Sequence, residues 1–451
     1  MLIASESNFK ISLNNHIWFP LLIVLFRFIP ITADFSYVVL AIYALFGRQQ
    51  IILALFLLWL FSMLNPEIAP IANKESFSKY ITILTCFLSI IIRVNFAKID
   101  KITTLSVGLG FFFIVHGYFF SQISEISILK ALNWTVVITI LLLAWNEMNS
   151  SERKSTKNLI TGFLLTIILI SLALLLFSDL GYELNSRYFQ GMLNHSQSFG
   201  LTASSLTILL IVQLFNHNRS KLLLWINILI CISLVLASGS RTSGLALISA
   251  ILIFSILFPL LKIYKFKLFP YILINKFFFL VVSTLILLML IFNNMILSVY
   301  SGYMIKSEKI NFNNLLLSYK ESRSVLYEPM IDNIIQNPKL GIGFGIASDM
   351  SSMRIKYFKS IPVSAPTEKG ILPLLILEEV GFYGFAFFIL WVFILLKRAN
   401  ANGPESLLVL LTLLMFNLGE AGLFSPNGFG MLYLILLTSV VTKTKKIPIK
   451  D

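Results

Sequence analysis

Three arginines stand in polar segments between long apolar runs of the sequence. Arg241 lies in the short segment 238–242 (SGSRT), Arg323 in the segment 322–327 (SRSVLY), and Arg187 in a longer polar segment. A guanidinium presents its donors as a fork that matches two oxygens of a phosphate. The small residues beside Arg241 let a ligand approach the backbone closely. These arginines are therefore candidate ligands of a phosphate-containing substrate, although an arginine so placed can also reach lipid headgroups.

Two residues are candidates for a proton acceptor. His195 follows Asn194 in the same polar segment as Arg187, and Glu368 ends another polar segment directly before an apolar run. Either side chain can act as a general base if it reaches the proton of a reacting hydroxyl. Each also has a structural interpretation, because His195 can simply precede a helix and Glu368 can pair with Lys369.

A pair of carboxylates lies inside the apolar run that follows Glu368. Glu378 and Glu379 are adjacent there. An ionised carboxylate in such a run needs a cationic partner or a polar cavity. The sequence therefore predicts that other parts of the chain supply one or the other.

Several other chemistries have no residues to support them. The sequence has no Cys/His cluster with metal-ligand spacing, no P-loop, no Asp-x-Asp pair for a nucleotide-sugar metal and no G-x-S-x-G elbow. Its two cysteines, Cys86 and Cys231, lie in apolar runs and predict no disulfide framework. We therefore expect no metal and no cofactor. The pattern fits transfer from a phosphate-activated lipid.

Composition indicates which kind of protein must position these residues. The chain has 451 residues, of which 57% are hydrophobic and 12% charged, and its mean hydropathy is +0.87. Soluble domains carry about 25% charged residues, so the sequence predicts a polytopic membrane protein. Residues 1–15 lack a basic region followed by a small-residue cleavage site, so we expect no cleavable signal peptide.

Apolar runs predict the membrane spans. A spanning helix needs about 20 apolar residues, and about fourteen runs approach that length. Pro30 and Asp34 interrupt the first two runs, which predict either one broken span or a re-entrant pair, so the count is about 12–14. The expected spans are 17–32, 34–47, 50–64, 78–93, 103–120, 130–146, 158–177, 199–215, 222–238, 242–261, 275–299, 370–396, 404–418 and 428–442.

Basic residues predict the orientation of these spans. They occur in alternate short loops, beginning with Arg48 and ending with the Lys-rich segment 443–450, and the intervening short loops are nearly free of them. Lys and Arg accumulate on the cytoplasmic side of membrane proteins. Both termini are then expected in the cytoplasm, and Arg187, Arg241 and Arg323 on the other side.

One long polar segment, 301–368, interrupts the apolar pattern. It contains a glycine turn, 337–345 (NPKLGIGFG), and an amphipathic stretch opened by Arg323, which predicts a short helix lying against the membrane or the bundle. Long segments of this kind that are not linkers often carry function. We expect a single membrane domain, 1–451, with this loop inserted between two spans on the outer side.

The order and spacing of five motifs resemble one known family, the bacterial superfamily of Wzy-type O-antigen polymerases and O-antigen ligases. The motifs are 187–191 (RYFQG) followed by Asn194 and His195, 238–242 (SGSRT), 322–327 (SRSVLY), 337–345 (NPKLGIGFG) and 377–384 (LEEVGFYG). The resemblance covers roughly residues 187–384. The N-terminal third of the chain adds only hydropathy to it.

The resemblance implies an all-α, GT-C-like transmembrane bundle with one large periplasmic loop, in the bacterial inner membrane. It implies a metal-independent, inverting glycosyltransferase that joins undecaprenyl-pyrophosphate-linked oligosaccharide repeat units, with its active site facing the periplasm. Arg241 and Arg323, with Arg187 as a third, would bind the pyrophosphate. Glu368 or His195 would be catalytic. Expected partners are the lipid-linked donor and acceptor, membrane lipids and a chain-length regulator protein, but no nucleic acid.

One departure from the family pattern distinguishes polymerase from ligase. Ligases typically carry a His-Asn pair about eleven residues before the first Gly of the Glu-x-Gly-x-x-Gly segment. Here Gly370 stands at that spacing before Gly381, no His is near, and Glu368 is two residues away. This favours a surface-polysaccharide polymerase. A lipopolysaccharide O-antigen ligase and, from another class, a lipid-linked glycan flippase or transporter remain alternatives.

Overall fold

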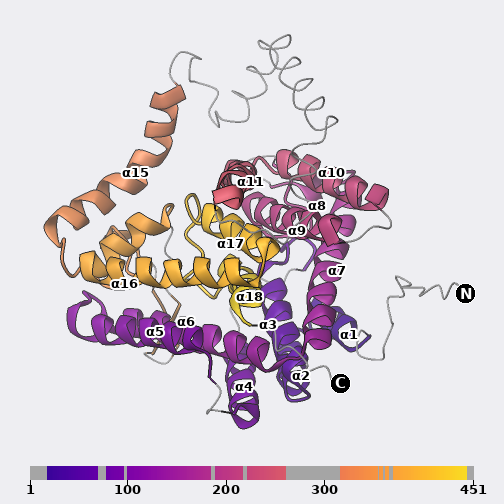
Figure 1. Ribbon diagram of the computed structural model, residues 1–451, viewed down its shortest axis with the longest axis horizontal. Coiled ribbons are helices and arrows are strands. Elements are labelled where there is room, and N and C mark those ends of the chain that lie inside the picture. Colours follow the sequence, from indigo (N-terminus) through magenta and orange to yellow (C-terminus); the bar gives the residue numbers. More distant parts are fainter. Residues whose placement is uncertain are drawn as a thin grey trace, which may run out of the picture.

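The structure, a computed structural model, describes residues 18–69, 78–95, 99–183, 188–216, 221–260, 315–353, 355–358, 361–364 and 369–443. These residues form a bundle of helices with one short β-hairpin (Figure 1). The helices are α1 (Trp18–Phe28), α2 (Phe35–Ala44), α3 (Arg48–Met63), α4 (Ser78–Arg93), α5 (Lys101–Phe120), α6 (Ser124–Glu147), α7 (Ser150–Leu174), α8 (Ser178–Gly181), α9 (Ser196–Asn216), α10 (Lys221–Ala237), α11 (Arg241–Leu260), α15 (Leu315–Gln336), the 3-10 helix η3 (Met350–Ser352), α16 (Leu372–Asn402), α17 (Pro404–Phe416) and α18 (Phe429–Val441), and the strands are β1 (Lys356–Phe358) and β2 (Ile361–Ser364).

The helices coincide with the expected spans. Each expected span has its helix except 275–299, which lies outside the described residues. Among the described helices, five are long and apolar enough to cross a membrane, namely α5, α6, α7, α9 and α16, and six shorter apolar helices accompany them. The expectation of an α-helical, multi-pass membrane protein is confirmed.

Burial separates central helices from lipid-facing ones. α3 and α18 are buried almost all round, with every residue of Ile51–Phe61 buried, as expected for helices at the centre of a bundle. Peripheral helices instead turn large apolar side chains outward, including Leu222, Leu229 and Leu236 on α10 and Leu245, Ile248 and Leu252 on α11. Continuous apolar outer faces of this kind fit a hydrocarbon environment rather than water.

The first two expected spans form two short helices. α1 has 11 residues and α2 has 10, so each is about 15 Å long and neither crosses a bilayer core alone. Arg27, at the end of α1, is buried at 1% exposure, donates to the carbonyl of Ala33 at 3.1 Å and lies 4.9 Å from the ring centre of Tyr37. This arginine therefore closes the turn between the two short helices.

Basic residues gather at one end of the bundle, which we call the basic end. Arg48 at the start of α3 donates to the carbonyl of Glu147 at the end of α6 at 2.9 Å. Arg153 of α7 donates to the carbonyl of Thr442, just after α18, at 3.1 Å. At the same end Arg398 of α16 binds Asp100, which precedes α5, at 2.6 Å. The described basic loops thus share one end, as their alternation in the sequence predicts.

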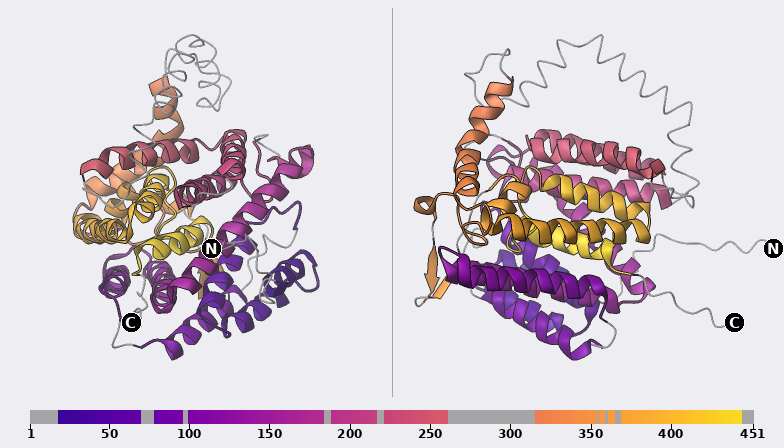
Figure 2. Two further views of the ribbon diagram at one scale, coloured as in Figure 1. Left: turned by 45° about the vertical axis from the view of Figure 1, so that its right-hand side comes forward. Right: turned by 60° about the vertical axis from the view of Figure 1, so that its left-hand side comes forward.

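The opposite end, which we call the Arg241 end, carries the long connecting segments. Asn65, after α3, donates to the carbonyls of Leu180 and Gly191 at 2.7 and 3.0 Å. α15 lies at this end, roughly perpendicular to the bundle helices, and the β1–β2 hairpin lies at the same end, where β2 packs against α6 (Figure 2). The helix predicted in this polar segment is therefore present. It begins at Leu315, however, so Arg323 lies inside α15 rather than opening a short helix.

Candidate functional site

Arg241 is the first residue of α11 and follows a tightly packed serine turn. Ser238 and Ser240 are buried, Ser240 shares a 2.5 Å hydrogen bond with Ser243, and Gly239 adopts a φ of 60°. A side chain at Gly239 would collide with the ring of Tyr188. The turn is therefore fixed from both sides, which gives Arg241 a defined starting position. The amide groups at the start of α11 add a partial positive charge beside the guanidinium, which favours an anion there.

Two elements pack against the residues on either side of this arginine. On one side, α9 packs against the serine turn so closely that a Cβ at Gly200 would collide with Ser240. On the other, Gly419 in the α17–α18 connection lies against Thr242, and its following residue is Glu420. Sequence reasoning missed the α17–α18 connection, because nothing in the linear pattern joins it to Arg241.

His195 lies at the same end, directly before α9. Its Nδ1 lies 3.3 Å from Oε1 of Glu183, and its side chain is 71% exposed. The same carboxylate oxygen accepts the backbone N–H of Ser196 at 2.6 Å, so Glu183 also caps α9. A carboxylate on one imidazole nitrogen orients the ring and leaves the other nitrogen for a proton. Sequence reasoning identified His195 but not its partner Glu183.

The remaining sequence-predicted site residues are described only in part. Arg323 lies in α15, which lies at the Arg241 end (Figure 2). Arg187 and Glu368 lie outside the described residues. Of the five candidate site residues, the structure thus brings Arg241, His195 and the helix that carries Arg323 to one end of the bundle.

Glu378 and Glu379 have the cationic partner that their apolar run requires. Nζ of Lys369 lies 2.7 Å from Glu378 and 3.1 Å from Glu379, and all three side chains are at most 2% exposed. Lys130 of α6 interacts electrostatically with Glu379 and donates to the carbonyl of Gly345 at 2.6 Å. Lys369 was considered above as a partner of Glu368. In the structure its ammonium binds these two glutamates.

The network also reaches the polar segment. Asn333 of α15 donates to Oε1 of Glu378 at 2.7 Å, and Ser348 donates to Oε2 of the same carboxylate at 3.1 Å. The backbone N–H of Gly345 donates to Oε2 of Glu379 at 2.7 Å. Every carboxylate oxygen of the pair therefore has a donor, which is the condition for burying such charges.

A break in α16 receives residues 337–348, which contain the glycine turn 337–345 and which we call the docked loop. Gly381 has φ 62° and ψ −168°, a conformation essentially restricted to glycine. The break frees the carbonyls of Glu378 and Glu379, which accept the N–H groups of Ile342 and Gly343 at 2.9 and 2.8 Å. The glycine-rich sequence of the turn thus serves close backbone packing here, since a Cβ at Gly341 would lie 2.5 Å from the carbonyl oxygen of Glu378.

Aromatic and polar contacts complete the seating of the docked loop. Phe344 stacks on Phe113 of α5 with ring centres 4.4 Å apart, and its ring edge meets Phe424. His116, also on α5, donates through Nε2 to the carbonyl of Leu340 at 2.6 Å. The docked loop is therefore fixed to the bundle through α5, α6 and α16 together.

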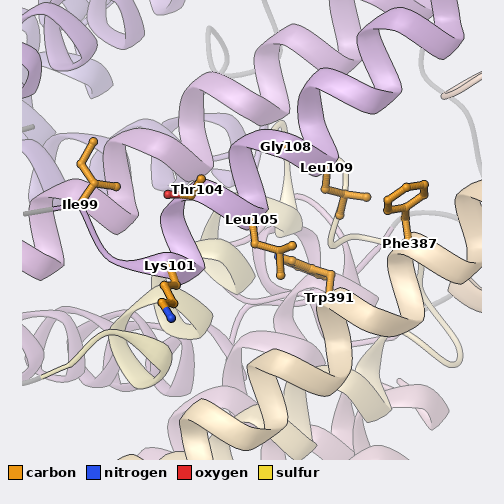
Figure 3. A pocket seen from close by; sticks show the side chains of 8 residues that line it. All are labelled: Ile99, Lys101, Thr104, Leu105, Gly108, Leu109, Phe387 and Trp391. Atoms are coloured by element: carbon orange, nitrogen blue, oxygen red, sulfur yellow. The ribbon is translucent and has the colours of Figure 1, made fainter.

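A cavity of about 460 Å³ lies elsewhere, between α5 and α16 (Figure 3). Its lining is mostly apolar, and Lys101 and Thr104 lie toward the basic end of α5. The docked loop and Arg241 do not line it. We therefore assign the candidate site to the loops of the Arg241 end and not to this cavity.

Metal ligation has no support among the residues that the structure describes. No group of three or more His, Cys, Asp or Glu side chains there has the proximity to hold an ion. Among the described residues, the Arg241 end offers the Arg241 guanidinium, the His195–Glu183 pair and helix N-termini. Such a set binds anions and moves protons without requiring a metal.

The fold and the apolar outer faces define an α-helical, multi-pass membrane protein whose polar segments concentrate at the end opposite its basic loops. Comparison of the sequence with protein-family models gives no match, and comparison with curated proteins gives none either.

Proposed function

We propose that this protein is a surface-polysaccharide polymerase, an inverting glycosyltransferase that joins undecaprenyl-pyrophosphate-linked oligosaccharide repeat units. In this proposal the basic end faces the cytoplasm of a bacterial inner membrane, in keeping with the positive-inside rule. The Arg241 end then faces the periplasm, and 301–368 is the periplasmic loop. The motif resemblance described above supports the class of reaction.

One observation carries the proposal. Arg241 follows a rigid turn at the end of an apolar bundle, and the helix that bears Arg323 runs across that same end. A lipid-linked pyrophosphate sits at this depth, with its tail in the hydrocarbon and its anionic group at the surface. Guanidinium groups held at that level would neutralise the charge that develops as pyrophosphate leaves. Arg187 would be a third ligand.

The proposed reaction is a single displacement. A hydroxyl oxygen of the acceptor glycan attacks C1 of the donor's reducing-end sugar, the bond from C1 to the pyrophosphate oxygen breaks, and undecaprenyl pyrophosphate departs with the bonding electrons. The hydroxyl proton passes to a base or to water. The described geometry supports His195, oriented by Glu183 at 3.3 Å, as a base, and Glu368 is the second candidate.

The buried charges weigh against the transporter alternative. A transporter is expected to hold its charged residues at a substrate site near the bilayer midplane, between repeats. Here Glu378 and Glu379 are saturated by donors from Lys369, Asn333, Ser348 and Gly345. They thus have a bonding role within the protein.

Deletion of the gene in its host tests the proposal against the ligase alternative, which uses the same chemistry on a different acceptor. For a polymerase, the long-chain ladder of surface polysaccharide disappears while a single repeat unit remains on the core. For a ligase, the core carries no repeat unit at all. An unchanged ladder would refute both glycosyltransferase assignments.

A further inference from the structure

A buried network of charged side chains beside the break in α16 joins two parts of the chain that are far apart in sequence. On the bundle side are Lys130, Lys369, Glu378 and Glu379, two ammonium groups and two carboxylates that balance in charge. On the other side are α15, through Asn333, and the docked loop, through Gly345 and Ser348. The network is thus the polar connection between α15 and the break in α16.

We propose that these four charged residues form a latch that fixes the position of α15 over the Arg241 end. This inference rests on the proposed function in one respect only. If Arg323 binds the pyrophosphate, the four charged residues are positioning residues for Arg323 and so for that site. The latch itself is a statement about the placement of α15 and can be tested without any substrate.

Energetics favour a positioning role over simple stabilisation. Burying an ion pair loses so much solvation that well-packed apolar side chains of similar volume often stabilise a protein as well or better. Directional charge-assisted hydrogen bonds, however, accept only one geometry. The donors here are set by three separate elements, with carboxylate contacts of 2.7–3.1 Å. The arrangement is therefore suited to fixing where α15 lies.

α15 transmits this position toward Arg323. Asn333, Met330 and Tyr327 recur at intervals of three residues, so they lie on one face of the helix. Asn333 binds Glu378, Met330 is fully buried, and Tyr327 packs against the core. The anchored face thus extends to within about one helical turn of Arg323. A shift at Glu378 would move the segment that carries the arginine.

The most selective variant is Asn333→Ala. It removes the bond between α15 and the latch, and with it the donor to Oε1 of Glu378, but the two ammonium groups and two carboxylates stay balanced, so we expect the fold to be retained. Glu378→Gln weakens the same connection from the bundle side. The matched control is Asp100→Asn, which breaks the 2.6 Å pair with Arg398 at the basic end. Amounts of membrane-inserted, monodisperse protein are compared first for all variants.

The position of α15 is measured by spin-label distances between Glu328→Cys on α15 and Asn427→Cys in the α17–α18 connection, both exposed sites. The native Cys86 and Cys231 are buried and label poorly. We expect a narrow distance distribution for the parent and for Asp100→Asn. We expect a broadened or shifted one for Asn333→Ala and Glu378→Gln. Parent-like distributions in both latch variants would overturn the proposal.

Kinetics test the consequence for the site. With lipid-linked repeat units as substrate, Asn333→Ala is expected to lower kcat on the order of 10²-fold, because a displacement of about 1 Å at the reacting centre has that effect. KM should change little. A broadened distance with unchanged kcat would overturn the positioning role. If the distance distribution broadens in the latch variants but the wild-type protein makes no polymer, the latch stands and the proposed function is refuted.

Discussion

Replacing Gly381 by alanine tests the interaction between the break in α16 and the docked loop. The residue has φ 62° and ψ −168°, a region open essentially only to glycine. An added Cβ would lie 2.5 Å from the backbone nitrogen of Leu340 and closer still to the backbone of Lys339. Because the colliding atoms are backbone and not a flexible side chain, the docked loop must move.

The expected cost follows from these contacts. Backbone strain in such a region costs about 1–3 kcal/mol. Moving the loop also weakens three backbone hydrogen bonds: Ile342 to Glu378, Gly343 to Glu379 and Phe382 to Pro338, at 2.9, 2.8 and 2.9 Å. Each such bond is worth about 1 kcal/mol. We therefore expect Gly381→Ala to destabilise the protein by about 4 kcal/mol.

Thermal unfolding in detergent, followed by the fluorescence of the six tryptophans, measures this cost. The apparent Tm should fall by about 5 °C for a protein of this size. Gly162→Ala is the matched control, because a Cβ there meets nothing within 4 Å and the residue lies inside α7. It should leave Tm unchanged or raise it, since alanine favours a helix by about 1 kcal/mol over glycine. A wild-type Tm for Gly381→Ala would refute the account of the docked loop.

Three further predictions concern the proposed site. Arg241→Ala should insert normally yet lose about 3 kcal/mol of transition-state stabilisation. Arg241→Lys should also lose most activity, because an ammonium cannot bind two phosphate oxygens as a guanidinium does, and full activity in this variant would show that charge alone matters. Cysteine at Lys339 should be labelled by an impermeant reagent from the periplasm and cysteine at Lys397 only from the cytoplasm, and the reverse result would invert the proposed orientation. Glu368→Gln and His195→Gln should separate the two base candidates, since loss of the true base lowers kcat by about a hundredfold or more with little change in KM. Normal turnover in both variants would mean that the proton leaves to water.

Hydropathy predicted the helices because the membrane imposes a simple rule on composition. Apolar runs locate α3, α4, α17 and α18 within a few residues. Helices that continue beyond the apolar run were predicted too short. α6 begins at Ser124 and α7 at Ser150, where polar residues extend the helix into the connecting segments. Nothing in a hydropathy pattern distinguishes such polar helical turns from loops.

The partners within the candidate site were less accessible from sequence. The apolar surroundings of Glu378 and Glu379 indicated either a cationic partner or a polar cavity, and the structure supplies the cation, Lys369, nine residues before the first of them. Asn333 lies 45 residues from Glu378 along the chain, and no local rule pairs them. Glu183 was overlooked for the same reason, since its contact with His195 depends on how a twelve-residue segment folds back. Such contacts are set by tertiary packing.

For the glycine turn, the sequence predicted a tight backbone but not the surface against which the turn packs. A repeated glycine in a loop indicates tight backbone, and positive φ angles at Gly341, Gly343 and Gly345 confirm it. What the sequence did not provide is the surface against which the turn packs. That surface exists only because Gly381 interrupts α16 and exposes two carbonyls.

The central claim is tested most directly by reconstituting the purified protein with undecaprenyl-pyrophosphate-linked repeat units as the sole glycan substrate. The account predicts lipid-linked chains that lengthen by whole repeat units, in the presence of EDTA, with the donor C1 configuration inverted in each new bond. The Arg241→Ala variant in the same membranes should yield only the input unit. Wild-type protein that is folded and inserted yet leaves the input unit unextended would contradict the claim.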